Sequence, residues 1–132
     1  MARTPVTTDI TPVEKSVWVR WMAHGLPAAG YIILKNSADR SFDITEVKSP
    51  DYEKVTLYQS VVDGENQKMV KLDKFTVPAK GEFGFAPGEH HIFFEKPTRA
   101  IKPGDQARVI FYLDDGKAVK VYMPVRTSPE LY

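Results

Sequence analysis

The chain contains no cysteine among its 132 residues. This absence excludes disulfide bonds, cysteine nucleophiles and thiolate metal sites. It does not indicate the cellular compartment, because a chain without thiols tolerates both oxidising and reducing surroundings. The N-terminal sequence MARTPVTTDITPVEKS also lacks the apolar centre of a signal peptide. Either the protein stays in the cytoplasm, or a signal peptide has been removed from this sequence.

Long apolar runs and strong charge are missing as well. The longest apolar runs, such as GYIIL and VIFYL, fall far short of the roughly 20 residues of a transmembrane helix, so we expect no membrane span. The net charge is +1, and the lysines are scattered without an aromatic-rich basic block. The sequence therefore predicts no nucleic-acid partner.

Motifs that carry catalysis are scarce. No G-x-S-x-G elbow is present, and the glycines of KGEFGFAPGE match no phosphate-binding pattern. Adjacent carboxylates occur only as Asp114 and Asp115 in a turn-like segment, where solvated acids are ordinary. We therefore expect that the protein is not an enzyme.

The pattern that is present is that of β-strands. Short runs rich in Val, Ile, Phe, Tyr and Thr alternate with Gly, Pro, Asn and Asp. This spacing predicts an all-β sandwich or barrel of eight or nine strands in one domain, with a tight hairpin turn at Asp115-Gly116. The expected strands are Ser16–Met22, Gly30–Lys35, Phe42–Lys48, Val55–Val62, Lys68–Leu72, Glu82–Ala86, His91–Lys96, Ala107–Leu113 and Ala118–Val125.

Several segments in sequence order resemble the periplasmic copper chaperones of the PCuAC family. The segments are VWVRW, PAAGYIILKN, ITEVKSPDYEKVTLYQS, VPAKGEFGFAPGEHHIFF and KPGDQARVIFYLDDG. The resemblance covers Val13 to Val125 and implies a cupredoxin-like β-sandwich, which we assign to residues 13–126. The Thr and Pro of the first dozen residues predict a flexible N-terminal arm (1–12), and residues 127–132 are expected to form a C-terminal tail. It also implies a periplasmic location, Cu(I) as the bound metal, and a partner that accepts copper or assists oxidase assembly.

The family binds copper through the pattern His-x10-Met-x21-His-x-Met. On this chain the four positions fall on Tyr58, Met69, His91 and Phe93 without a gap. The resemblance thus implies that Met69 and His91 are retained ligands, whereas Tyr58 and Phe93 replace a histidine and a methionine. Phenylalanine offers no lone pair, and a phenol with a pKa near 10 is a poor partner for a soft monovalent ion.

Two readings of this altered site remain open. In the first, Met69 and His91 bind Cu(I) weakly, with His24 or His90 recruited as a further donor. In the second, the aromatic rings and Met69 pack together, and the scaffold serves as a metal-free module that binds a protein or a small ligand. His90 and His91 are adjacent on an expected strand, so they point to opposite faces. We expect His91 to face the inherited site and His90 to face solvent.

Overall fold

The computed structural model describes residues 5–23 and 26–127. Within them it contains eleven strands and one short 3-10 helix, and no α-helix. The predicted all-β class is therefore confirmed, although the strand count is higher than the predicted eight or nine. The elements are β1 (Ile10–Pro12), η1 (Glu14–Ser16), β2 (Trp18–Arg20), β3 (Ala28–Asn36), β4 (Phe42–Lys48), β5 (Tyr52–Asp63), β6 (Asn66–Leu72), β7 (Phe75–Val77), β8 (Glu82–Phe85), β9 (His90–Pro97), β10 (Gln106–Leu113) and β11 (Ala118–Arg126).

The strands form one hydrogen-bonded path that wraps around a single apolar core. Its order is β6-β5-β9-β3-β2-β11-β10-β4-β7, with β1 and β8 paired to β3 off this path. Strands along the path supply side chains that are almost fully buried, among them Ile92, Leu34, Phe111 and Ile44. The central strand β3 contacts four other strands and so ties the two sides of the sandwich together.

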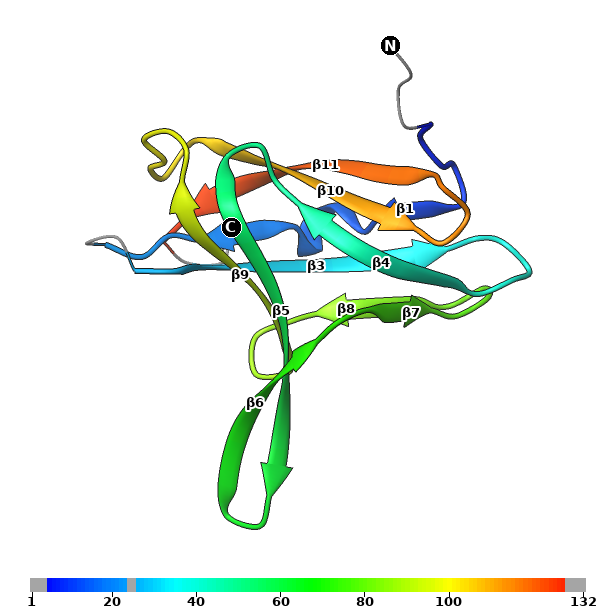
Figure 1. Ribbon diagram of the computed structural model, residues 1–132, viewed down its shortest axis with the longest axis horizontal. Coiled ribbons are helices and arrows are strands. Elements are labelled where there is room, and N and C mark those ends of the chain that lie inside the picture. Colours follow the sequence, from blue (N-terminus) through cyan, green and yellow to red (C-terminus); the bar gives the residue numbers. More distant parts are fainter. Residues whose placement is uncertain (1–4, 24–25, 128–132) are drawn as a thin grey trace.

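One hairpin leaves this body. Strands β5 and β6 run together away from the core and end at the turn of Gly64 and Glu65, at the bottom of Figure 1. Gly64 has a φ of 64°, the left-handed conformation that a two-residue hairpin turn needs. Every residue from Val61 to Lys71 is exposed. The family positions Tyr58 and Met69 lie on the two strands of this hairpin.

The predicted flexible arm of residues 1–12 is wrong for the part that the structure describes. Strand β1 pairs with the end of β3, Ile10 is 1% exposed, and Val6 forms a bridge with Ala118. The arm was misjudged because its three strand residues include Pro12, which weakens a strand pattern. The predicted tail from 127 onward lies almost wholly outside the described residues.

Most strand predictions agree with the structure, and the two missed strands are short. Strand β4 has the predicted bounds, and the expected turn at Asp115-Gly116 joins β10 to β11, with Gly116 at a φ of 84°. Strands β1 and β7 have three residues each, below the four to eight that a strand pattern requires. The predicted strand Ser16–Met22 is shorter, because η1 ends at Ser16 and only Trp18–Arg20 form β2.

Candidate functional site

The four family positions lie on one face of the sheet. In the antiparallel register Tyr58 of β5 is directly opposite His91 of β9, and Ser60 of β5 is opposite Met69 of β6. Residues directly opposite one another share a face, as do residues two apart on a strand. Phe93 therefore lies beside His91, and Met69 lies on the same face one step closer to the hairpin tip. The strand register therefore puts the four positions on a common face.

A row of rings crosses this face from β5 to β2. The Tyr58 and Phe93 centroids are 5.0 Å apart, and those of Phe93 and His91 are 5.9 Å apart. The His91 ring is also 5.9 Å from Tyr31, whose centroid lies 5.2 Å from that of Trp18. We call Trp18, Tyr31, His91, Phe93 and Tyr58 the aromatic row. It buries Trp18 and Tyr31 almost completely and leaves the other three half-buried.

Sequence reasoning missed Tyr31 and Trp18 as members of this row. Their approach depends on β3 lying between β2 and β9, which no spacing along the chain encodes. Burial raises the pKa of Tyr31, while the nearby Arg20 guanidinium partly opposes that rise. The inner end of the row is thus a neutral, packed phenol next to a cation.

The imidazole of His91 is held by rings and lacks polar anchoring. Its Nδ1 atom is buried without a hydrogen-bond partner among the described residues. Burial, followed by the charge of His90, lowers the pKa of His91, so the ring is neutral at physiological pH. A histidine that binds a metal usually donates its second ring N–H to a carboxylate or carbonyl. His91 has a neutral imidazole that can donate a lone pair to a metal, but its Nδ1 has no carboxylate or carbonyl partner among the described residues.

His90 lies on the opposite face of β9, as the strand alternation predicts. The expectation that it faces solvent is wrong, because its ring packs 4.9 Å from the Phe83 centroid and 5.8 Å from that of Phe85. Its Nδ1 atom is buried and unpartnered among the described residues. Strand β8 supplies both phenylalanines, and no local pattern in the chain indicates that β8 covers this side. The structure does not bring His90 to the face of Met69 and His91.

The donors on the family face are therefore few. Met69, a residue that is 45% exposed, supplies a thioether, and His91 supplies an imidazole. Tyr58 and Phe93 fill the other two positions with hydrocarbon rings. The residues found at the four positions do not fit a complete four-donor Cu(I) site. His24, the other predicted recruit, lies outside the described residues, and no cluster of three or more His, Cys, Asp or Glu occurs within them.

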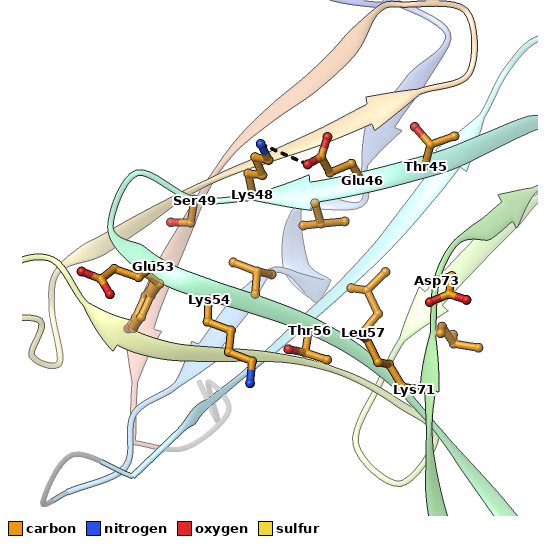
Figure 2. Close-up of a pocket in the computed structure, with 14 residues that line it drawn as sticks. Thr45, Glu46, Lys48, Ser49, Glu53, Lys54, Thr56, Leu57, Lys71 and Asp73 are labelled. Atoms are coloured by element: carbon orange, nitrogen blue, oxygen red, sulfur yellow. Dashed lines mark ion pairs between the residues drawn. The ribbon is translucent and has the colours of Figure 1, made fainter.

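A groove of about 510 Å³ opens between β4 and β5, and no residue of the aromatic row lines it. Figure 2 shows residues 45–49 along one wall, residues 53–57 along the other, and Lys71 and Asp73 at one end. Lys48 forms an ion pair with Glu46 at 3.0 Å, and this contact raises the pKa of the lysine. The lining carries no histidine, and its three carboxylates are interspersed with three lysines. It therefore offers neither soft metal donors nor an evident acid–base pair.

The fold matches solved copper-protein domains. The copper-bound PCuAC domain from PmoF2 superposes with a TM-score of 0.75 at 22% identity, covering 97% of this chain and 100% of that chain. The Cu(I) form of DR1885 from Deinococcus radiodurans gives a TM-score of 0.65 at 21% identity, covering 96% of this chain and 81% of that chain. The predicted cupredoxin-like, PCuAC-type fold is confirmed.

A family model described as "Putative lipoprotein LpqE-like" matches residues 14–125, and the chain belongs to this LpqE-like family. A curated relative, uncharacterized protein RP573 of Rickettsia prowazekii (strain Madrid E), is 28% identical over 89 residues. That match covers 67% of this chain and 49% of the relative, so the chain spans about half the length of the curated relative it matches. No helix in the described ranges is long and apolar enough to cross a membrane.

Proposed function

We propose that this chain is an extracytoplasmic copper-homeostasis domain of the PCuAC type, and not an enzyme, with an altered site that holds Cu(I) weakly. The observation that carries the proposal is the pairing of Tyr58 with His91 on the sheet face that also bears Met69 and Phe93. This geometry keeps the family's four positions together while it leaves two of the four donors. The lipoprotein description of the LpqE-like family supports the location outside the cytoplasm.

The retained donors suit cuprous ion. Thioether and neutral imidazole are soft or borderline ligands that favour Cu(I), whereas carboxylates favour harder ions. Met69 is exposed enough to reach a metal arriving from solvent, and the lowered pKa of His91 keeps its imidazole free of a competing proton. Two donors without hydrogen-bonded support hold the ion loosely.

Loose binding fits transfer by ligand exchange. A partner that accepts copper, such as an oxidase assembly factor, would add its own His, Met or Cys donors before Met69 and His91 let go. Met69 is exposed on the β5–β6 hairpin, which leaves the approach to the ion open on that side. The cargo is therefore released when a better donor set arrives, without a conformational change in the sheet.

The test is a Cu(I) titration of the purified protein against a chromophoric chelator under reducing conditions. We expect a Kd weaker than about 1 μM, which corresponds to roughly −8 kcal/mol. Met69→Leu and His91→Gln should each weaken binding at least about tenfold, which is about 1.4 kcal/mol. His90→Gln is the matched control, because His90 occupies the other face, and it should leave the Kd unchanged.

Two results would overturn the proposal. One is nanomolar or tighter binding by the unmodified chain, which two donors do not explain. The other is binding that survives both Met69→Leu and His91→Gln, which would place the ion elsewhere. A His24→Ala variant, measured in the same titration, reports whether that histidine contributes a third donor.

A further inference from the structure

Strand β6 is an open edge of the sheet. It is the last strand of the hydrogen-bonded path and pairs with β5 through all seven of its residues. Its other edge has no strand partner among the described residues, and the hairpin that carries it projects from the body (Figure 1). An open edge presents a row of N–H and C=O groups that another chain can pair with.

The pairing with β5 shows which residues of β6 point their backbone groups outward. Asp63 and Asn66 flank a two-residue turn, and such closing residues exchange their hydrogen bonds with each other. Bonding alternates along an antiparallel pair, so Lys68 and Val70 also bond toward β5. On the other side of β5, the Ser60 N–H donates to the Glu89 carbonyl at 2.8 Å, which agrees with this alternation. The backbone groups of 67, 69 and 71 are therefore the ones that point away from β5.

The hairpin also carries uncovered apolar side chains on both faces. Val62 is 73% exposed and Met69 45% on one face, and Val61 is 37% exposed and Val70 47% on the other. A two-stranded hairpin without cover is marginally stable in water. A third strand along β6 would pair the outward backbone groups and place its own side chains beside Met69 and Val70 on the two faces.

We propose that a second copy of this chain supplies that strand, through antiparallel pairing of β6 with its counterpart around a two-fold axis at Met69. In this register Met69 lies opposite Met69 of the second copy, and Gln67 lies opposite Lys71. All the outward backbone groups of 67, 69 and 71 then find partners. An interface of this kind uses the same patch on both copies, as two-fold dimers do.

Charge favours this register over its neighbours. It places Lys68 opposite Val70 and Lys71 opposite Gln67, so that no like charges are directly opposed. A register centred on Lys71 would place the two copies of Lys71 opposite each other. A register centred on Gln67 would place Met69 opposite Glu65, which belongs to the turn and not to the strand. The Lys68 ammonium also lies 3.5 Å from the Asp63 carboxylate of its own hairpin, which offsets its charge at the edge.

The dimer is a weak one. A single added strand pair belongs at the small end of interfaces, below about 1,200 Å², where transient associations are found. The inference goes beyond the proposed function, because it depends only on the register of β5 and β6 and needs no copper. It places two thioethers side by side on the face of the aromatic row.

The absence of cysteine makes a sharp test available. Single-cysteine variants are oxidised with glutathione disulfide at several protein concentrations, and covalent dimer is measured on non-reducing gels. Met69→Cys should form dimer, since opposed residues in a bonded pair lie about 5.5 Å apart at Cα, within the range of a disulfide. A mixture of Lys68→Cys and Val70→Cys should form mainly the mixed dimer, because each residue opposes the other and lies too far from its own copy. Val62→Cys is the control, since it is more exposed but sits on the inner strand.

Sedimentation equilibrium of unmodified protein provides an independent measurement. We expect a concentration-dependent dimer that Lys71→Pro abolishes. Proline removes the outward N–H of residue 71, and the two-fold axis makes this loss occur at both ends of the interface. An edge strand tolerates proline at such a position, so the monomer should still fold. Circular dichroism establishes that the variant stays folded. A protein that remains monomeric at millimolar concentration, or a Val62→Cys dimer that forms as fast as the Met69→Cys dimer, would overturn the inference.

Discussion

Tyr58 and Phe93 pack ring against ring across β5 and β9, with centroids 5.0 Å apart and an interplanar angle of 55°. This contact stands where the PCuAC pattern has a histidine and a methionine. The rings lie at the positions where the resemblance implies donors, on a backbone whose fold matches solved PCuAC domains. In the function proposed above, the change in chemistry comes from these two side chains.

Restoring those two donors should restore tight copper binding. The double variant Tyr58→His with Phe93→Met keeps the strand register and adds an imidazole and a thioether beside Met69 and His91. We expect Cu(I) affinity to rise on the order of 100-fold or more, about tenfold for each donor, in competition with a chelator. Adding Met69→Leu to the double variant should remove much of the gain. No gain in the folded double variant would mean that the four positions are not a metal site in this chain.

A buried carboxylate just before β5, paired with two half-exposed arginines, should control stability in acid. Asp51 is fully buried, and its Oδ1 accepts hydrogen bonds from Arg99 Nε at 2.9 Å and Arg108 Nη2 at 2.8 Å. The Arg108 backbone N–H also donates to Oδ2 at 2.8 Å. Asp51→Ala should cost about 1–3 kcal/mol, since it removes charge-assisted hydrogen bonds from Arg99 and Arg108, whose side chains are 43% and 52% exposed and can turn to water. Urea denaturation measures this loss.

The exposed ion pair of Arg40 and Asp114 gives a matched control. Its side chains are 53% and 34% exposed, so Asp114→Ala should cost less than about 1 kcal/mol.

The Arg108 and Arg99 hydrogen bonds hold the pKa of Asp51 far below its ordinary value of 3.8. The stabilisation from this carboxylate is therefore complete above about pH 5 and is lost as the pH falls below 4. The difference in stability between the unmodified chain and Asp51→Ala should shrink over that range; a constant difference would contradict the assignment.

The sequence predicted those parts of the molecule that depend on local pattern. Strand β4 was placed with its correct bounds because alternating residues are flanked by clear turn signals, and the two-residue spacing of His91 and Phe93 placed them on a common face of one strand. The parts it missed depend on which strands lie side by side. Nothing near Asp51 in the sequence indicates Arg99 and Arg108, which reach it from segments more than 45 residues away. His90 was put on the correct face, but its cover by β8 follows from the pairing of β8 with β3, which no local pattern encodes.

Close packing at Gly30 should make this position intolerant of any side chain. A Cβ added there would lie 2.5 Å from Phe94 Cε2 and 3.2 Å from its Cζ. Phe94 is 1% exposed and packs 5.0 Å from the Tyr52 ring, so it has little room to move. Gly30→Ala should therefore cost about 1–3 kcal/mol, although alanine normally stabilises a strand relative to glycine. Gly84→Ala, whose Cβ would meet only Ile33 Cγ1 at 3.4 Å, is the control and should be neutral or stabilising in thermal unfolding. Equal effects at the two glycines would show that Phe94 yields easily.

Titration of His91 should report how strongly the aromatic row excludes water. Burial among Tyr31, Phe93 and Tyr58 is the main cause that lowers the pKa of His91 below 6.5, and the charge of His90 is the second. In the unfolded chain His91 takes up a proton at a higher pH than in the folded chain. The free energy of unfolding is therefore unaffected by this group above about pH 6.5 and decreases as the pH falls through that value. NMR of the imidazole protons should give a midpoint below 6.5. His90→Gln should raise that midpoint slightly and Phe93→Ser should raise it more, because the first variant removes the smaller cause and the second exposes the ring to water. A larger rise in His90→Gln than in Phe93→Ser would make charge, not burial, the controlling influence on this donor.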